Sequence, residues 1–219
     1  MPTIGTNKPG RPKVEGLQLR RTGEILDAAT RLFAERGYPD TDIDSVAAEL
    51  KVAKGTIYRY FPSKRELFLA AVERGVQDLQ NAVHEHVDGV GDPIDRIVSA
   101  IQTYLSYFDS HPELVELFVQ ERAYFKDRRK PAYFAQHDAN FGRREGFCRQ
   151  LIAEGRLREL SVAPEFDVVN DFLYGTVMAN YFTGRKVSVE KQAESIVDIL
   201  FNGILSDEER RRRQGNGGR

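Results

Sequence analysis

Residues 37–67 read GYPDTDIDSVAAELKVAKGTIYRYFPSKREL, and this stretch decides the fold of the chain. It contains two short helical patterns, at residues 41–50 and 54–61, which are joined by a three-residue turn. The second pattern is basic, hydroxyl-rich and aromatic on its outer face, and Ile57 and Phe61 lie on its inner face. A helix so short and polar adds little to a hydrophobic core. Its composition instead favours presentation to a partner such as DNA.

Amphipathic helical patterns flank this stretch on both sides. Before it, apolar residues recur at helical spacing over residues 25–33, and Gly37 ends the pattern. After it, Ser63 and Glu66 form a capping box that starts a long helix. Further patterns follow near residues 93–108, 112–125, 131–154, 164–183 and 188–205. We therefore predict an all-α fold of about nine helices, with an N-terminal three-helix helix-turn-helix domain and a C-terminal helical domain.

Composition and charge predict four parts along the chain. Residues 1–18 contain three prolines and no helical period, which indicates a flexible basic arm. Residues 19–65 form the helix-turn-helix domain, residues 66–206 the C-terminal helical domain, and residues 207–219 a disordered tail. Residues 1–65 carry 12 basic and 8 acidic side chains, whereas residues 66–219 carry 20 and 25. The basic excess therefore coincides with the helix-turn-helix, which fits a nucleic-acid surface, although ordinary variation in surface charge is also compatible with it.

The composition argues against several other classes of protein. Cys148 is the only cysteine, so no internal disulfide can form and a reducing cytoplasm is expected. No apolar run reaches the roughly 18 residues needed to span a bilayer. His84 and His86 lie two residues apart in a helix and cannot chelate a metal together. We expect no metal, no cofactor, no membrane partner and no enzymatic activity, since no phosphate-binding loop or nucleophile motif is present.

The region of residues 20–70 resembles the TetR-type family of bacterial transcriptional regulators. The positions that carry the resemblance are Arg21, Ile25, Leu26, Ala28, Ala29, Leu32, Phe33, Gly37, Tyr38, Thr41, Ile43, Val46, Ala47, Val52, Lys54, Gly55, Thr56, Ile57, Tyr58, Tyr60, Phe61, Ser63, Lys64 and Leu67. The resemblance implies a homodimer whose helix-turn-helix reads the major groove of a double-stranded DNA operator. It also implies a C-terminal domain that binds a small-molecule effector, and repression more often than activation.

Three residues depart from the pattern of that family. The turn has Lys51 where the family often has glycine, and a positive φ at this residue would cost about 1 kcal/mol. Ala53 replaces a frequent serine, which removes a side-chain cap before the second short helix. Arg65 stands where glutamate is common and adds positive charge near the expected phosphates.

The expected DNA-reading surface lies on the second short helix. It comprises Lys54, Gly55, Thr56, Tyr58, Arg59 and Tyr60. We expect the two cations to contact base edges or phosphates, and the two tyrosine hydroxyls to bond phosphates. The threonine methyl suits a thymine methyl, and the glycine lets the helix approach the groove closely.

Three further residues are expected to contact DNA. The Thr41 hydroxyl, with neighbouring backbone N–H groups, suits a phosphate at the positive end of a helix, although a plain N-cap is also compatible. Lys64 lies in the first turn of the long helix, and the resemblance implies a phosphate contact there. Arg11 belongs to a Gly-Arg-Pro element that suits an A·T-rich minor groove, and a solubilising arm is equally compatible.

A ligand pocket and a dimer interface are expected in the C-terminal helices. Polar residues lie among aromatic ones on the faces predicted to line the pocket, and these faces comprise Tyr104, Phe108, Phe118, Phe134, His137, Phe141, Asn170, Leu173 and Val177. Such a lining suits a largely apolar ligand, although partners within the protein would also satisfy the polar groups. The last two helices are apolar around much of their circumference, which favours a two-fold dimer built on Phe172, Gly175, Ala179, Phe182, Ile196, Ile199 and Gly203. A monomer that buries both helices is the alternative.

The resemblance also implies a mechanism of release. A bound effector would tilt the helix that starts at Ser63, because this helix is the covalent link between the two domains, and the spacing of the reading helices would then change. The alternative is a DNA-binding protein whose output is a protein–protein contact rather than ligand-controlled transcription. Its N-terminal domain would be identical, and only the C-terminal surface would differ.

Overall fold

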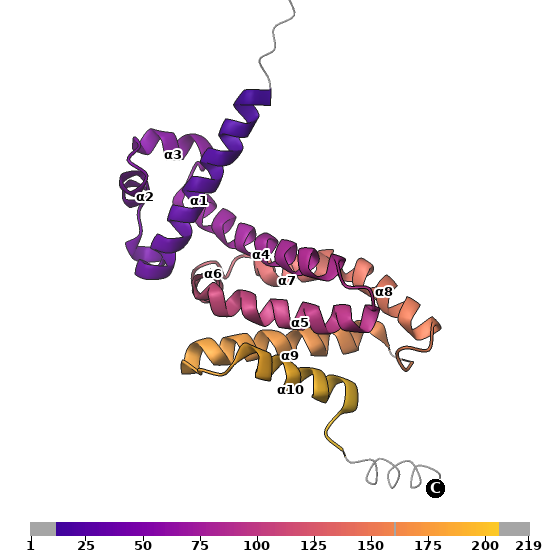
Figure 1. The fold of residues 1–219 in the computed structure, drawn as a ribbon. Helices are drawn as coiled ribbons and strands as arrows, with labels where there is room; N and C mark the ends of the chain where they lie inside the picture. Colours follow the sequence, from indigo (N-terminus) through magenta and orange to yellow (C-terminus); the bar gives the residue numbers. More distant parts are fainter. Residues whose placement is uncertain (1–11, 160, 206–219) are drawn as a thin grey trace, which may run out of the picture. The chain divides into compact units, whose positions relative to one another are not determined.

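The computed structural model describes residues 12–159 and 161–205, and within these ranges it contains ten α-helices and no strand (Figure 1). The helices are α1 (Pro12–Asp40), α2 (Ile43–Glu49), α3 (Lys54–Tyr60), α4 (Lys64–Asp88), α5 (Pro93–Ser110), α6 (Pro112–Tyr124), α7 (Ala132–Ala139), α8 (Phe141–Ala153), α9 (Val162–Thr183) and α10 (Val189–Asn202). The all-α prediction is confirmed. None of the helices in the described ranges combines the length and apolar character needed to cross a membrane.

The chain forms two compact units. The first contains the residues up to Asp78 together with His111–Gly142, and the second contains Leu79–Ser110 together with the residues from Arg143 onward. Helix α4 passes from the first unit into the second at residue 78. The predicted domain boundary between residues 65 and 66 rests on sequence motifs, whereas these two units are defined by packing. The boundary therefore stays a prediction.

Helix α1 begins earlier than predicted, and it continues to Asp40 beyond a non-helical residue at Gly37. It starts at Pro12, a residue whose fixed φ suits the first turn of a helix, so residues 12–18 are helical rather than part of a flexible arm. The predicted break is confirmed, because Gly37 has φ 83° and ψ 160° and interrupts the helical backbone before Asp40. The rest of the predicted arm and the predicted tail, residues 1–11 and 206–219, lie outside the described residues.

The break at Gly37 leaves carbonyl groups of α1 without helical partners, and side chains from later in the chain bind them. These hydrogen bonds join Thr41 Oγ1 to Leu32 O (3.0 Å) or Gly37 O (2.9 Å), Gln120 Nε2 to Phe33 O (2.8 Å), and Lys64 Nζ to Pro39 O (2.9 Å). Thr41 and Gln120 are both buried. The end of α1 is therefore held by residues from the start of α2, from α4 and from α6.

An aromatic cluster in the first unit joins α1, α4 and the end of α6. The Phe68 ring on α4 lies 5.0 Å from Phe33 on α1, 5.2 Å from Tyr38 and 5.1 Å from Phe125 after α6, between ring centroids. Phe33 and Phe68 are completely buried. Because α1 and α6 also pack extensively against each other, the helix-turn-helix and α6 share one hydrophobic core.

Replacing Gln120 tests the buried hydrogen bond at the end of α1. Gln120→Leu keeps the volume but leaves Phe33 O without this donor, and an unsatisfied buried carbonyl costs about 1–3 kcal/mol. We expect a lower free energy of unfolding by that amount, measured by urea denaturation. Gln102→Leu on the exposed face of α5 is the control and should change stability by less than about 0.5 kcal/mol. Equal effects of the two variants would contradict the prediction.

In the second unit, α5 packs against α9 and α10 (Figure 1). Ile101, Leu105 and Phe108 form the buried stripe of α5. Near the turn between α9 and α10, Asn180 and Gln192 exchange hydrogen bonds through their amide groups, at 2.7 and 3.3 Å. This pair satisfies the polar groups of two half-buried side chains and fixes the start of α10 beside the end of α9.

The prediction of a single helix over residues 131–154 is wrong, because the structure contains two helices there. Helix α7 ends at Asn140, whose backbone has φ −95° and ψ 0°. The Asn140 side-chain amide donates to Gln136 O at 3.2 Å, and the backbone N–H of Asn140 approaches the same oxygen. Such local side-chain bonds compete with helix propagation, which accounts for the break and for ten helices rather than about nine.

Candidate nucleic-acid interface

Asp42, not Thr41, caps helix α2. The Asp42 carboxylate accepts a hydrogen bond from Ser45 N at 2.7 Å, and its hydrogen bonds to Ser45 hold the pKa of Asp42 below its ordinary value. The prediction that Thr41 caps the helix is wrong. Thr41 is fully buried and its hydroxyl serves the end of α1, so it does not lie at the surface where a phosphate would bind.

The turn between α2 and α3 has the two features expected from its sequence. Lys51 has φ 53°, a left-handed conformation that costs about 1 kcal/mol for a residue with a side chain. Ala53 precedes α3 in an extended conformation without any side-chain cap. The turn is closed by its backbone instead, since Val52 N donates to Ala47 O at 2.9 Å.

Helix α3 shows one side to the core and the other to solvent. Ile57 is fully buried, and Phe61 at the end of the helix is 8% exposed, so the predicted inner face is confirmed. The residues of the predicted reading surface are the exposed Lys54, Gly55, Tyr58 and Arg59 and the half-buried Thr56 and Tyr60. A Cβ atom on Gly55 would meet no atom within 4 Å, so nothing in the described chain blocks the approach of a ligand there.

The two cations of this surface differ in their partners. Lys54 Nζ lies 2.5 Å from Asp44 Oδ2 on α2, and this hydrogen bond raises the pKa of Lys54. The same ammonium lies 5.9 Å from the centre of the Tyr58 ring. Arg59 has neither an ion-pair nor a hydrogen-bond partner among residues 12–159 and 161–205. Arg59 is therefore the cation of α3 whose predicted contact with a phosphate or base edge would not first require another contact to break.

The first turn of α4 carries two further cations. Lys64 Nζ donates to Pro39 O and lies 4.5 Å from the centre of the Tyr38 ring, so its predicted phosphate contact would share the ammonium with these groups. Arg65 binds Asp127 at 2.6 Å and stacks 5.0 Å from Phe125. The hydrogen bond to Arg65 also lowers the pKa of Asp127.

Sequence reasoning missed Asp44 and Asp127 as partners of the cationic surface. Asp44 lies ten residues before Lys54, and the turn brings the two together. Asp127 lies 62 residues after Arg65 in the sequence, and no local pattern marks the pair. Arg11, the predicted minor-groove contact, lies outside the described residues.

Asp44→Asn is expected to strengthen non-specific DNA binding. The change releases Lys54 from its ion pair and removes a negative charge beside the expected phosphates, so the salt dependence of binding should steepen by about 0.9 per added phosphate contact. Fluorescence anisotropy with random-sequence duplex at several salt concentrations measures this slope. Glu194→Gln, the same change of charge at an exposed site on α10, should leave the slope unchanged. An unchanged slope in Asp44→Asn would show that Lys54 does not face DNA.

The residues of the predicted ligand pocket are divided between the two compact units. Phe118, Phe134, His137 and Phe141 belong to the first unit, and Tyr104, Phe108, Asn170, Leu173 and Val177 belong to the second. Within the first unit, Phe118 and Phe134 both contact the Tyr133 ring, at 5.6 and 5.2 Å. Within the second, Tyr104 and Phe108 lie 5.0 Å apart. A pocket formed by all nine residues stays a prediction.

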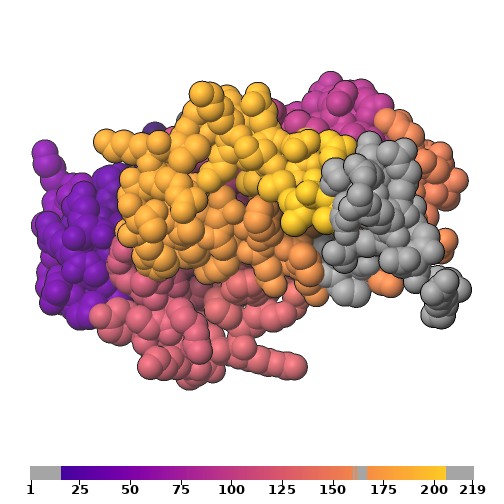
Figure 2. Space-filling view, turned by 90° about the horizontal axis from the view of Figure 1, so that it is seen from below, coloured from indigo at the N-terminus to yellow at the C-terminus, as the bar shows by residue number. Residues whose placement is uncertain are grey.

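Large apolar residues are exposed along α9 and α10, the helices coloured orange and yellow in Figure 2. Phe172, Phe182 and Ile199 of the predicted dimer interface are among them, at 42%, 65% and 44% exposure. Gly175 and Gly203 are also exposed, and Ala179 is half-buried. Ile196, the remaining residue of the predicted interface, is only 3% exposed and belongs to the core of its own chain. Its prediction as an interface residue is therefore wrong.

Comparisons with known proteins agree with this geometry. The family profile "Bacterial regulatory proteins, tetR family" matches residues 25–71. The HTH-type transcriptional repressor SCO4008 of Streptomyces coelicolor is 30% identical over 193 residues, which cover 80% of this chain and 93% of SCO4008. The HTH-type transcriptional regulator HbdR of Aromatoleum is 30% identical over 97 residues, so that match spans only 42% of HbdR.

Solved structures share the fold across most of the chain. The fatty acid degradation regulator FadR of Bacillus halodurans has a TM-score of 0.73 at 16% identity, over 90% of this chain and 98% of FadR. The transcriptional regulator FadR of Bacillus subtilis, solved in complex with stearoyl-CoA, has a TM-score of 0.67 at 19% identity, over 83% and 98% of the two chains.

Helix α3, the second helix of the helix-turn-helix, exposes cations, and helices α4 to α10 follow it. This arrangement is typical of a DNA-binding transcriptional regulator. The similarity to SCO4008 extends this assignment over most of the sequence. The chain belongs to the TetR family of bacterial regulatory proteins.

Proposed function

We propose that this regulator is a homodimeric repressor, which leaves its operator when a small, largely apolar ligand binds the C-terminal helices. The observation that carries the proposal is the exposed face of α3, where Lys54, Tyr58 and Arg59 stand outward from the fully buried Ile57. A rigid helix with cations and hydroxyls outward suits the major groove, where arginine and lysine recognise guanine and tyrosine hydroxyls bond phosphates.

The exposed apolar face of α9 and α10 supports the homodimer. Large apolar side chains gathered on one surface are unfavourable in water and commonly mark protein interfaces. Gly175, on the exposed side of α9, has no neighbour within 4 Å of a Cβ position, which leaves room for a second helix to approach closely. In a two-fold dimer this face packs against the same face of the partner subunit. Phe172, Phe182 and Ile199 would then be buried in both subunits.

The proposed ligand class rests on a structural neighbour and on the composition of the helices. FadR of Bacillus subtilis shares the fold and was solved with stearoyl-CoA, a molecule with a long apolar chain. The aromatic residues predicted to line the pocket suit such a chain. We therefore propose a ligand with a substantial apolar body.

Contacts within the first unit support the proposal that movement of α6 is transmitted through α4 to the helix-turn-helix. Asp127 and Arg128, which follow α6, bind Arg65 at 2.6 Å and Glu73 at 3.0 Å on α4. Arg128 also binds the buried Glu121 of α6, at 3.0 Å. A ligand that shifts α6 would pull on α4 through these contacts. To release the operator, it must bind the released state more tightly by several kcal/mol.

We assign no catalytic activity to the chain, because the relatives it resembles over most of its length are regulators. We place it in the cytoplasm, because the operator DNA that it reads lies there in a bacterial cell.

Selection from a random double-stranded DNA library tests operator binding. We expect enrichment of an inverted repeat whose half-sites are about 34–36 Å apart, one helical turn, because two copies of α3 enter successive major grooves. Sedimentation should give a dimer. A protein that sediments as a single subunit and enriches no sequence at low salt would overturn the proposal.

A thermal-shift screen of fatty acids and acyl-CoA esters tests the effector. A compound that raises the melting temperature and weakens binding to the selected operator supports ligand-controlled repression. A protein that no such compound affects, and that binds a defined protein partner through its C-terminal helices, would support the alternative in which the output is a protein–protein contact.

A further inference from the structure

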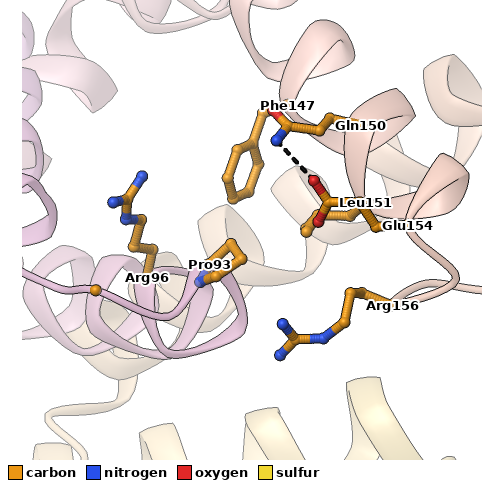
Figure 3. Close-up of a pocket in the computed structure, with 8 residues that line it drawn as sticks. Pro93, Arg96, Phe147, Gln150, Leu151, Glu154 and Arg156 are labelled. Atoms are coloured by element: carbon orange, nitrogen blue, oxygen red, sulfur yellow. Dashed lines mark hydrogen bonds between the residues drawn. The ribbon is translucent and has the colours of Figure 1, made fainter.

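A hollow of about 340 Å³ lies within the second compact unit, between the start of α5 and the C-terminal half of α8 (Figure 3). Its volume falls within the range of small-molecule sites. The side chains around it include Pro93 and Arg96 from α5, Phe147 and Leu151 from α8, and Glu154 and Arg156 just after α8. The predicted ligand pocket shares none of these residues, so the hollow is a separate feature.

Arg96 is fixed beside the hollow with its hydrogen-bonding capacity only partly used. Its Nε donates to Val90 O at 2.6 Å, and the side chain is half-buried. Within the described part of the chain, its two terminal nitrogens have no acceptor. A guanidinium that is anchored at Nε presents these remaining N–H groups as a fork, which matches the two oxygens of a carboxylate or phosphate.

The other charged side chains around the hollow, Arg156 and Glu154, each have a hydrogen-bond partner. Arg156 binds Asp92 at 2.8 and 3.1 Å, and this contact lowers the pKa of Asp92. Asp92 also accepts hydrogen bonds from Ile94 N and Asp95 N at the start of α5, so its charge is well compensated. Glu154 accepts from Gln150 at 2.8 Å. Arg96 is therefore the cation that a bound anion would neutralise.

Pro93, Phe147 and Leu151 form the apolar part of the lining, which gives the hollow an orientation. Leu151 lines the hollow and is 1% exposed, and Phe147 is half-buried. In Figure 3 the Phe147 ring and the Pro93 ring lie next to Arg96, whereas Glu154 and Arg156 lie at the opposite side of the hollow. A ligand with one anionic group at Arg96 would place an apolar body on Phe147 and Leu151. The carboxylate of Glu154 disfavours a second negative charge.

We infer that this hollow binds a small amphipathic anion, with one carboxylate or phosphate held by Arg96 and an apolar body against Phe147 and Leu151. Such a molecule would bind the C-terminal helices whether or not it acts as the effector. Any influence on operator release rests on the proposed function, whereas binding itself does not depend on DNA.

Isothermal calorimetry without DNA tests the inference, with octanoate as the carboxylate probe, octyl phosphate as the phosphate probe and octanol as the uncharged control. We expect at least one of the two anions to bind and octanol to bind at least about tenfold more weakly, because the uncharged hydroxyl cannot form charge-assisted hydrogen bonds with the Arg96 guanidinium. The stronger anion identifies the head group. Binding of neither anion, or equal binding of octanol, would overturn the inference.

Three variants assign the binding to Arg96. Arg96→Gln should weaken binding of the anion about 10- to 100-fold, and Arg96→Lys should weaken it less because it keeps the charge without the fork. Arg143→Gln, the same change at an exposed site on α8, should have no effect. Melting curves verify that the Arg96 variants fold. Should Arg96→Gln be unfolded, Glu154→Gln decides the matter, because loss of its negative charge should strengthen anion binding about two- to fivefold.

Operator release is then measured separately with the same probes. Anion binding that depends on Arg96 but leaves operator affinity unchanged supports the site and counts against its role as the effector site. Loss of operator affinity in the presence of an anion that still binds Arg96→Gln with wild-type affinity would contradict the site and leave the proposed regulation intact.

Discussion

Arg59→Ala is expected to weaken operator binding by about two orders of magnitude or more. Each reading helix loses a contact worth about 1–3 kcal/mol, and a dimer loses it at both half-sites. Arg59 is exposed and lacks a partner in the described ranges, so its removal should not disturb the fold. Anisotropy titration with the selected operator measures the affinity, and the melting temperature should stay within about 2 °C of wild type.

Arg185→Ala is the matched control for this change. Arg185 is also an exposed arginine, but it follows α9 and lies far along the chain from the reading helix. Its loss should change operator affinity less than about twofold. An operator affinity of Arg59→Ala that equals that of Arg185→Ala would mean that the outer face of α3 does not read DNA. A large fall in melting temperature would instead mean that Arg59 supports the fold.

Phe68→Ala is expected to lower the free energy of unfolding by about 3–5 kcal/mol, the usual cost of deleting a buried phenylalanine side chain. The Phe68 ring is completely buried and contacts rings from α1, from the segment after Gly37 and from the end of α6. Its removal leaves a cavity where these elements meet. Differential scanning calorimetry should show a fall in melting temperature of about 6–20 °C for a chain of this length.

The control for Phe68→Ala removes an apolar side chain that lies in solvent. Leu19 on α1 is 75% exposed, so Leu19→Ala should change stability by less than about 0.5 kcal/mol. A loss below about 1 kcal/mol for Phe68→Ala would show that the surrounding rings close the cavity, or that this cluster adds little to folding. Operator affinity at a temperature where the variant remains folded should change little, because Phe68 is remote from solvent.

The core of the helix-turn-helix was predictable because its apolar residues follow helical spacing closely. Ile25, Ala28, Phe33, Val46 and Ile57 were all expected inside and are all buried. Helix ends were less predictable. Pro12 starts α1 before the predicted residue 19, because the fixed φ of proline suits the first turn of a helix. Asn140 divides a predicted helix, because its side-chain hydrogen bond is not revealed by periodicity.

The candidate site was predictable in its location and less so in its details. Lys54, Tyr58 and Arg59 are exposed as the pattern of α3 required. Thr41 was expected at the DNA surface but is buried, because the break at Gly37 provides carbonyl acceptors for its hydroxyl. The sequence predicts that the helix ends at Gly37, but helical spacing does not show that the Thr41 hydroxyl turns back to the carbonyl groups at that end.

The amino-acid sequence by itself determined the all-helical class, the helix-turn-helix and the exposed face of α3. These properties depend on local periodicity, turns and charge, which neighbouring residues specify. Only the tertiary structure decided that Asp44 holds Lys54, that Asp127 holds Arg65, and that Arg96 faces a hollow beside Phe147. Each of these arrangements joins side chains from different helices, and their meeting depends on how the helices pack rather than on their spacing along the chain.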